Sequence, residues 1–459
     1  MPTAAAAAAV DDDECRISSK EMEWVVQIKE KVEQMADTSK EMQQWKKRSI
    51  YKVPACVTDL NKKAYRPQSV SFGPYHHGEE RLKPMEDHKH RALLHFLKRS
   101  NKSIHEYVKA LQSVVQQLKD CYDSLASDWH QDTNKFLQLM LLDGCFMLEV
   151  LRTDQIGTSD DDDDDDYPSN DPIFSRHGTL HFMPYIRRDM LMIENQLPML
   201  VLEKLLAVET GKPIKDEVLN RMIIKFWGPN TPVPKGKCLH VLDAYRKSLL
   251  EDESHKKKQK RKSTSAHSND YESTGEIIRS ATELYEAGIR FKKSKTGSLR
   301  DITFHGGVLK LPLIVVDDVT ESMFLNLMAF ERLHVGAGNE ITSYIFFMDN
   351  IIDNAKDVSL LHSSGIIQNA LGSDKGVAKL FNQLSKDVTL DPESGLDVVH
   401  KKVHDYCKKR WNEWRANLIH TYFRSPWAIL SLIAAIVLMA LTIAQTVYTI
   451  YPFYHDSNN

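Results

Sequence analysis

The longest apolar stretch of the chain lies close to its C-terminus. Residues 427–450 contain no Asp, Glu, Lys, Arg or His. At about 1.5 Å per residue, a helix of this length covers roughly 36 Å, enough to cross a hydrocarbon core of roughly 30 Å. We expect a single transmembrane helix here, because the alternative, a helix buried in a globular core, usually carries a polar face at this length.

The charges on either side of this stretch predict the orientation of the chain. Basic residues precede it, whereas the tail 451–459 has neither Lys nor Arg. The positive-inside rule therefore places the large N-terminal body in the cytosol. Residues 427–450 are expected to contact the lipid bilayer, and the residues expected at the membrane interface are Lys408, Lys409, Arg410, Arg415, Arg424 and Trp427.

Ahead of this stretch, apolar residues recur mostly at helical spacing, which predicts a mainly α fold. Ser103 and Glu106 form a capping box that predicts the start of a helix over 104–118, and Pro84 fits the first turn of another. Residues 136–151 are apolar nearly all round, as in a central core helix. Further helices are expected within 190–206, 216–226, 239–250, 273–288, 320–333, 341–354, 375–384 and 393–424.

Two short stretches depart from the helical spacing. Ile302 and Phe304 alternate with polar residues, and 308–316 is rich in Val, Leu and Ile. These patterns predict strands of a small sheet, in which Pro312 fits only at an edge or a bulge. The expected fold class is a large helical domain with a small β element and one C-terminal transmembrane helix.

Composition divides the chain into an N-terminal segment (1–49), a large domain (50–424), the span (427–450) and the tail (451–459). In the first segment, an apolar stripe predicts a helix that docks on the body or joins a coiled coil; its residues are Val25, Ile28, Val32, Met35 and Met42. Residues 160–166 are consecutive Asp, which repel one another and predict a disordered loop. A calcium site is disfavoured, because consecutive Asp residues lack the ligand spacing of a calcium loop. The basic linker 251–272 is expected to be solvated or to contact anionic lipid.

The overall composition excludes some classes of function. A formal net charge of −3 gives no global attraction to nucleic acid. The six cysteines are far apart and form no C-x-x-C pair, which favours reduced thiols over a disulfide framework or a structural zinc site. No cofactor is expected, and the chain lacks a P-loop, a G-x-G-x-x-G and an H-E-x-x-H motif.

A cluster of polar residues near Gly78 is the strongest chemical candidate. If a helix begins at Pro84, Glu86 and His90 share a face, and the histidines of the preceding turn could complete a metal site with them. Adjacent histidines can equally fix the turn by bonding its backbone, and this is the interpretation we favour. The residues of the cluster are His76, His77, Glu86, His88 and His90.

The trio Glu194, Asn195 and Gln196 is the second candidate, because acid and amide groups between apolar residues can orient a substrate. A helix interrupted by Pro198 also leaves backbone groups in need of partners, and amide side chains supply them. We therefore favour a buried structural network. Asp143 and Glu149 could likewise be structural or act on a substrate. We expect them to pair with Arg residues.

Several phrases of the sequence, in their order along the chain, resemble the plant domain of unknown function 247 family. They are IYKVP at 50–54, SFGPYHHG at 71–78, Met85 and Glu86 with Lys89, LDGCF at 142–146, DMLMIENQLP at 189–198, SATEL at 280–284, GGVLKLP at 306–312, and Ser343 and Tyr344 with Met348 and Asp349.

The resemblance implies a mainly helical plant protein held at a membrane, with the plasma membrane expected. The family has no agreed biochemical activity, although some grass members are associated with self-incompatibility. We expect a non-enzymatic interaction or signalling component that binds an unknown protein partner. The alternatives are an enzyme of unknown reaction, such as a hydrolase, and a structural organiser that binds anionic lipid.

Overall fold

The computed structural model describes residues 19–33, 42–43, 45–59, 61–156, 167–228, 231–251, 279–386, 396–412, 414–415 and 426–455. It divides the chain into two units, Met1–Arg48 and Ser49–Asn459. In the first unit, the predicted stripe is helical in α1 (Ser19–Glu33), where Trp24, Ile28 and Val32 are exposed. Beyond Glu33, Met35 lies outside the described residues and Met42 is exposed, and the coiled coil stays a prediction.

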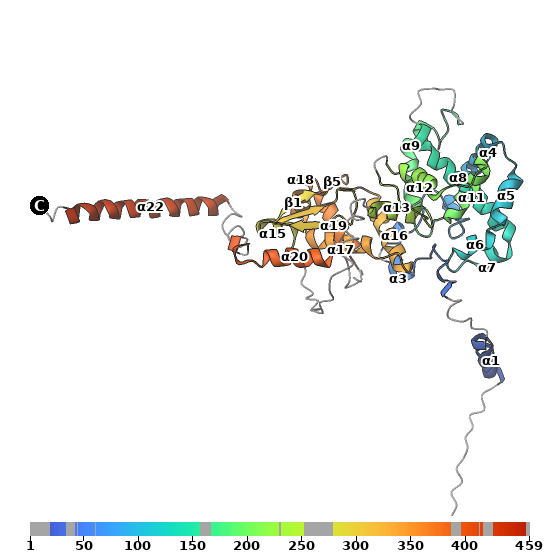
Figure 1. Ribbon diagram of the computed structural model, residues 1–459, viewed down its shortest axis with the longest axis horizontal. Coiled ribbons are helices and arrows are strands. Elements are labelled where there is room, and N and C mark those ends of the chain that lie inside the picture. The colour runs from blue at the N-terminus through green and yellow to red at the C-terminus, as the bar shows by residue number, and fades with distance from the viewer. Residues whose placement is uncertain are drawn as a thin grey trace, which may run out of the picture. The chain divides into compact units, whose positions relative to one another are not determined.

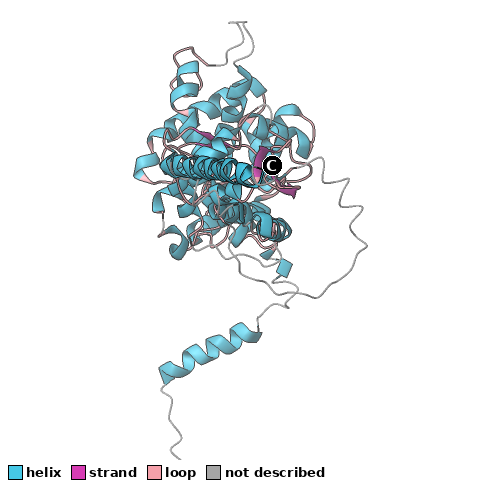
Figure 2. Cartoon of the chain, turned by 90° about the vertical axis from the view of Figure 1, so that its left-hand side faces the viewer, coloured by secondary structure: helices cyan, strands magenta, loops and turns pink. Residues whose placement is uncertain are grey.

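The second unit is mainly helical, with few and short strands, which confirms the predicted fold class (Figure 2). Four helices pack on one another to form what we call the first helix cluster (Figure 1). They are α4 (Pro84–Ser100), α5 (Ile104–Gln112), α8 (Thr133–Ile156) and α11 (Met199–Thr210). The other elements of this part of the chain are α3 (Ala55–Thr58), η1 (Lys62–Ala64), η2 (Glu80–Leu82), α6 (Val115–Asp120), α7 (Ser127–Gln131), α9 (Arg176–His181), α10 (Met183–Asp189), α12 (Asp216–Lys225) and α13 (Val241–Leu250).

The centre of this cluster is α8, as its apolar sequence predicts. Its side chains from Met140 to Leu151 are almost all buried. Helix α11 approaches α8 closely at Gly144, where a Cβ would lie 2.6 Å from Leu205 Cδ1 and 2.8 Å from Val201 Cγ1. Because Gly144 has no side chain, α8 and α11 can pack closely at this point.

The capping box at Ser103 is confirmed, because its hydroxyl accepts from the backbone of His105 at 3.3 Å and Glu106 accepts from the backbone of Ser103 at 3.2 Å. The single helix predicted over 104–118 is wrong. It breaks after Gln112, and α6 begins at Val115.

The second helix cluster follows in sequence and includes the strands. Its helices are α15 (Ala281–Glu286), α16 (Thr320–Leu333), α17 (Glu340–Ile351), α18 (Ala355–Ser363) and α19 (Asp374–Leu384). A three-stranded sheet has the order β1 (Arg290–Lys293), β3 (Val308–Leu311), β2 (Thr303–His305), and a second sheet pairs β4 (Ile314–Val316) with β5 (Ile367–Asn369). Pro312 lies between β3 and β4, so no strand has to accommodate it.

The region after the second cluster differs from its prediction. Within the expected helix over 393–424, α20 (Asp397–Cys407) ends before Lys408, and helical residues resume at 410–412 and 414–415 after a break at 408–409. Tyr406 of α20 packs edge-on against Phe304 of β2, with ring centroids 5.5 Å apart. The capping box predicted at Ser273 and the charged runs at 160–166 and 252–272 lie outside the described residues.

The C-terminal apolar stretch forms α22 (Pro426–His455). Within it, Trp427–Ile450 has a mean hydropathy of 2.5 and none of its most apolar window is buried. Among the described helices it is the one that is long and apolar enough to cross a membrane.

Buried polar side chains join the two helix clusters. Asn326 of α16 donates to the carbonyl of Ala64 at 2.8 Å and accepts from the backbone of Ile193 at 3.0 Å. Arg246 of α13 donates through Nε (2.9 Å) and Nη2 (2.6 Å) to one carboxylate oxygen of Glu331 in α16. That carboxylate also accepts from the backbone of Ile341 at 3.0 Å, so it holds the start of α17 as well.

Replacing Glu331 should be far more costly than replacing an exposed carboxylate. Glu331→Ala leaves the buried Arg246 with less compensation, and the loss of one partner of a buried pair costs about 3–5 kcal/mol of unfolding free energy. The matched control is Asp59→Ala, which removes an exposed ion pair to Lys62, and such a pair is worth about 0–1 kcal/mol. Urea unfolding of the full chain in detergent measures both, and equal losses would contradict this account.

Candidate functional site

A backbone segment without regular structure crosses the first helix cluster at residues 68–73, and side chains from elsewhere in the chain accept from the N–H groups of 68–70, 72 and 73. Asn195 accepts from Phe72 N at 2.7 Å, and Asp143 of α8 accepts from Gly73 N at 2.8 Å. Buried backbone groups are costly when unpaired. The polar side chains that meet this segment are therefore needed to bury it, and we call the whole network the polar junction.

Asp189, at the end of α10, anchors the start of this segment. Its buried carboxylate accepts from the backbone N–H groups of Gln68, Ser69 and Val70 at distances of 2.6 to 3.0 Å. Asp189 is the first residue of the DMLMIENQLP phrase, and residues 68–70 come just before the SFGPYHHG phrase. The two family phrases are therefore connected through Asp189.

Asn195 and Gln196 are fully buried and bond almost entirely to backbone. Asn195 donates to the carbonyls of Val70 and Asp189, both at 3.0 Å. Gln196 donates to the carbonyls of Met190 (2.6 Å) and Met192 (2.8 Å) and accepts from the backbone of Leu242 at 3.1 Å. Both amide groups therefore donate and accept at the same time.

The structural setting of this trio differs from the prediction. Residues 190–198 form a loop between α10 and α11, so the trio does not lie in a helix interrupted by Pro198. Pro198 instead stands at the N-cap of α11, where its missing N–H leaves no donor unpaired.

Lys89 and Asp143 form a fully buried ion pair at the centre of the polar junction. Lys89 Nζ lies 2.7 Å from Asp143 Oδ1, and both side chains have no exposed surface. Glu86, one turn before Lys89, lies 2.8 Å from the same ammonium group, and Ser71 accepts from it at 3.2 Å. Burial raises the pKa of Asp143, and the charge of Lys89 opposes that rise.

This pair corrects one expectation. Asp143 was expected to pair with Arg, and its partner is Lys89. The signal was present in the sequence, because Lys89 shares the apolar stripe of α4 with Met85, Ala92 and Phe96. A cation on the buried face of a helix requires a buried partner.

His76 lies between two carboxylates at the edge of the polar junction. Its Nδ1 is 2.6 Å from Glu79 Oε1, and its Nε2 is 3.3 Å from Glu194 Oε2. Burial disfavours the charged imidazole, but the hydrogen bonds and charges of Glu194 and Glu79 outweigh it and raise the pKa of His76. Glu194 also accepts from the backbone of Val53 at 2.6 Å, which ties the IYKVP phrase to the junction.

The other members of the candidate cluster are not gathered around His76. His77 packs edge-on against Trp129 with ring centroids 5.5 Å apart, and His90 is exposed on α4. The pKa of His88 is lowered by burial and by the charge of Arg91. Within the described residues, no group of three or more His, Cys, Asp or Glu side chains is placed to hold a metal ion.

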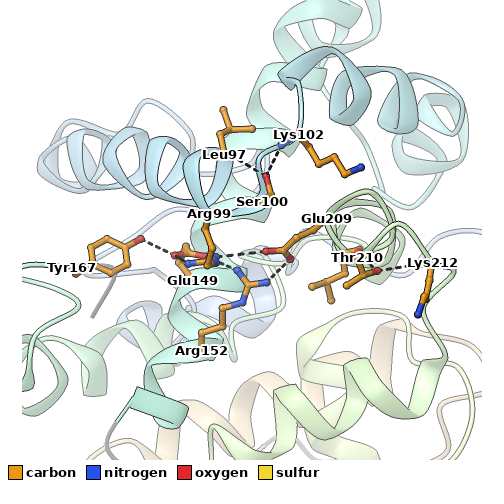
Figure 3. Close-up of polar contacts among 11 residues, drawn as sticks. Leu97, Arg99, Ser100, Lys102, Glu149, Arg152, Tyr167, Glu209, Thr210 and Lys212 are labelled. Atoms are coloured by element: carbon orange, nitrogen blue, oxygen red, sulfur yellow. Dashed lines mark hydrogen bonds and ion pairs between the residues drawn. The ribbon is translucent and has the colours of Figure 1, made fainter. Parts of the chain in front are cut away.

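A second charge network lies further along α8, around Glu149, and Figure 3 shows its members. Arg99 and Arg152 both donate to the buried carboxylate of Glu149, the latter at 2.7 Å, and Tyr167 donates to it at 2.8 Å. Glu209 of α11 pairs with Arg152 as well. The expected pairing of Glu149 with Arg is confirmed, and it links α4, α8 and α11.

The predicted membrane-interface residues do not lie together in the structure. Lys408, Lys409 and Arg410 are exposed just after α20, and Trp427 is exposed in the first turn of α22. The Arg415 side chain rests on Gly288, where a Cβ would lie 2.9 Å from its Nη1. Arg424 lies outside the described residues.

His240 is a buried polar residue that the sequence pattern did not single out. Its Nε2 lies 3.0 Å from the carbonyl of Ser49, and its Nδ1 accepts from the backbone of Asp243 at 3.2 Å. Complete burial lowers the pKa of His240 to about 4. A neutral ring with its proton on Nε2 satisfies both contacts, so His240 caps α13 and holds the chain just before Ile50.

A surface groove with a volume of about 580 Å³ lies where α10, η1 and the start of α16 meet. Tyr185 and Arg188 line it from α10, and Asp318 and Glu321 line it from the other side. Arg188 donates to the carbonyl of Lys63 at 2.8 Å, which fixes that end of the groove. The groove thus presents an exposed aromatic ring and both signs of charge.

The comparisons place these observations in one family. The sequence model of a family described as plant proteins of unknown function, domain of unknown function 247, matches residues 50–441. The chain belongs to this family. The phrases that suggested it therefore have a physical meaning, because IYKVP, SFGPYHHG, LDGCF and DMLMIENQLP all supply groups to the polar junction.

Two relatives from Arabidopsis thaliana support the membership. A UPF0481 protein is 33% identical over 436 residues, which cover 89% of this chain and 87% of the relative. A second protein, named a putative UPF0481 protein, is 25% identical in an alignment of 494 positions that covers 86% of this chain and 89% of that relative. Neither name states an activity, and no solved structure gives a significant match.

Two glycines of the SFGPYHHG phrase should respond differently to Ala. Both have a positive φ, but a Cβ on Gly73 would lie 2.8 Å from the Gln196 carbonyl, whereas Gly78 has open space. Gly78→Ala should cost about 1–2 kcal/mol of unfolding free energy from backbone strain alone. Gly73→Ala should cost roughly 1–3 kcal/mol more because it also crowds the polar junction. Urea unfolding measures both, and equal costs would mean that the junction can move aside.

The ion pairs of His76 should make stability depend on pH. Because the folded pKa lies above the ordinary value of 6.5, the charged ring stabilises the fold fully below that value, and this contribution is lost as pH rises through the folded pKa. The stability lost in His76→Gln should therefore be largest near pH 6 and shrink toward about pH 9. His362→Gln, at an exposed site, is the control, and a pH-independent difference for His76→Gln would refute the account.

Proposed function

We propose that this chain is a membrane-anchored family member whose helical body binds another protein at the cytosolic face, and that the membrane is the plasma membrane. The length and hydropathy of Trp427–Ile450 support the anchor. The basic residues before the span and their absence after it support the cytosolic orientation. Binding of a partner is then the task of the body.

The main support for a non-enzymatic role is that buried candidate polar residues form hydrogen bonds with the backbone. Asn195 and Gln196 are fully buried, and their amide groups bond to backbone groups of the segments they join. A substrate would have to displace these bonds, and each would leave a buried group unpaired. This arrangement supports a rigid platform rather than a reactive centre.

The groove lined by Tyr185, Arg188, Asp318 and Glu321 is the partner site that we propose. An exposed aromatic ring beside charged groups is typical of the residues that dominate binding energy at protein interfaces. The charges call for a protein segment that places a basic residue near Asp318 and Glu321 and an acidic group near Arg188. Buried Ser322 and Ala64 form the floor of the groove, so its shape is set by the core.

One arrangement favours a catalytic alternative. His76 lies between Glu79 and Glu194, and a carboxylate beside an imidazole is a common general-base arrangement. A hydrolase is the reaction class we would attach to it. His76 is only 6% exposed, so a substrate would have to reach it past Glu79, and we prefer the platform.

The two functions predict opposite results for two substitutions. Tyr185→Ala should reduce proximity labelling of a specific partner by about tenfold or more when the full chain is expressed in its own tissue, because interface aromatic residues often contribute 2 kcal/mol or more. Tyr285→Ala is the matched control, since Tyr185 and Tyr285 are both 53% exposed. Its labelling should match that of the unchanged chain.

The His76→Gln chain tests the catalytic alternative in the same experiment. Under the platform proposal it keeps both its partner and its biological effect. Loss of the biological effect with unchanged partner labelling, which reports that the chain still folds, would favour the enzyme and overturn the proposal.

A further inference from the structure

The exposed face of the three-stranded sheet carries only positive charge. Residue pairing places Arg290 opposite Val308, Lys292 opposite Lys310, Lys310 opposite Thr303, and Val308 opposite His305. The alternate residues Phe291, Leu309 and Phe304 form the buried face. Arg290, Lys292, Lys310 and His305 are all exposed on the other face, which we call the basic sheet face.

This face has no acidic partner among the described residues. No ion pair or side-chain hydrogen bond of Arg290, Lys292 or Lys310 is present in the part of the chain that the structure describes. Moreover, Lys292 and Lys310 stand directly opposite each other on neighbouring strands, and like charges in that position destabilise a sheet. An anion that bound across the pair would remove this repulsion.

The chain geometry keeps the basic sheet face near the proposed membrane. Arg415 rests on Gly288, two residues before β1 begins. Pro426, where α22 begins, follows Arg415 by eleven positions. A fully extended chain spans at most about 3.6 Å per residue, so the stretch from Arg415 to Pro426 reaches at most roughly 40 Å. This length limits how far the start of the span can lie from the contact with Gly288.

The other side of the sheet is already covered. Tyr406 of α20 contacts Phe304 on the buried face, and a Cβ on Gly307, in the turn between β2 and β3, would lie 2.6 Å from the Tyr406 hydroxyl. The positive φ values of Gly306 (57°) and Gly307 (77°) permit the tight turn that keeps β2 and β3 in register. The basic sheet face is therefore a rigid surface and is open to a large, flat partner.

We propose that the basic sheet face binds the headgroups of anionic lipids in the membrane that anchors the chain. This inference rests on the proposed anchoring by α22 and deepens it, because it assigns how the body is held against the surface. Two lysines and an arginine on a rigid sheet match a plane of phosphate and carboxylate groups, and a surface of negative potential attracts such residues additively. An area of membrane fits this open face better than a small phosphate compound, since its basic side chains are spread over the exposed side of three strands.

The test uses the full chain held in nanodiscs of neutral phosphatidylcholine, with vesicles of phosphatidylcholine containing phosphatidylserine as the probe. The unchanged chain should bind these vesicles, bind neutral vesicles far less, and lose its binding as salt rises. The double substitution Lys292→Gln with Lys310→Gln should weaken vesicle binding by roughly thirtyfold. Lys375→Gln with Lys379→Gln is the matched control, because both lysines are exposed on α19.

The outcomes separate this proposal from the proposed anchoring. Equal binding by the Lys292/Lys310 variant and the unchanged chain would overturn the lipid surface, as would an equal loss in the Lys375/Lys379 variant. Binding to neutral vesicles as tightly as to anionic ones would also overturn it. Alkaline extraction of cell membranes reports on the anchor alone: a chain that is released by it lacks the proposed span, whatever its vesicle binding.

Discussion

The fold depends on burying a stretch of backbone that belongs to no helix or strand. Residues 68–73 cross the first helix cluster, and their N–H groups find acceptors in the side chains of Asp189, Asn195 and Asp143. Because a buried and unpaired N–H costs about as much as a lost hydrogen bond, these acceptors cannot be exchanged for apolar residues without loss. The helices α4, α8 and α11 can therefore pack around this segment only because the polar junction satisfies its backbone groups.

This constraint explains why the family phrases look as they do. Each combines a polar group with glycine or with large apolar residues, as in LDGCF, where Asp143 pairs with Lys89 and Gly144 admits α11. A sequence with such phrases can resemble an enzyme, since acids, amides and histidines recur in it. Their contacts with backbone give most of them a structural task instead, whereas the His76 group keeps titrating side chains near the surface.

The sequence predicted the elements whose burial is periodic and missed those that depend on distant partners. Helices α8, α16 and α19 follow from apolar spacing, and the capping box at Ser103 acts locally. In contrast, β1 holds one buried residue, Phe291, among charged ones, and it is a strand because β3 lies beside it. The pairing of His76 with Glu194 joins residues far apart in sequence, and spacing along the chain carries no information about such a contact.

The long reach of the polar junction has a consequence for how the chain folds. The bonds from Asn195 to Val70 and to Phe72 join residues 125 and 123 positions apart, and the Lys89–Asp143 pair closes a loop of 54. Closing such loops lowers the entropy of the chain before the new contacts can stabilise it. Contacts of this kind therefore tend to form late and slow the folding of a chain. During synthesis, the backbone donors of residues 68–70 must wait for Asp189 to emerge, and that of Phe72 must wait for Asn195. Until then, the first half of the first helix cluster can form its local helices but cannot close its core.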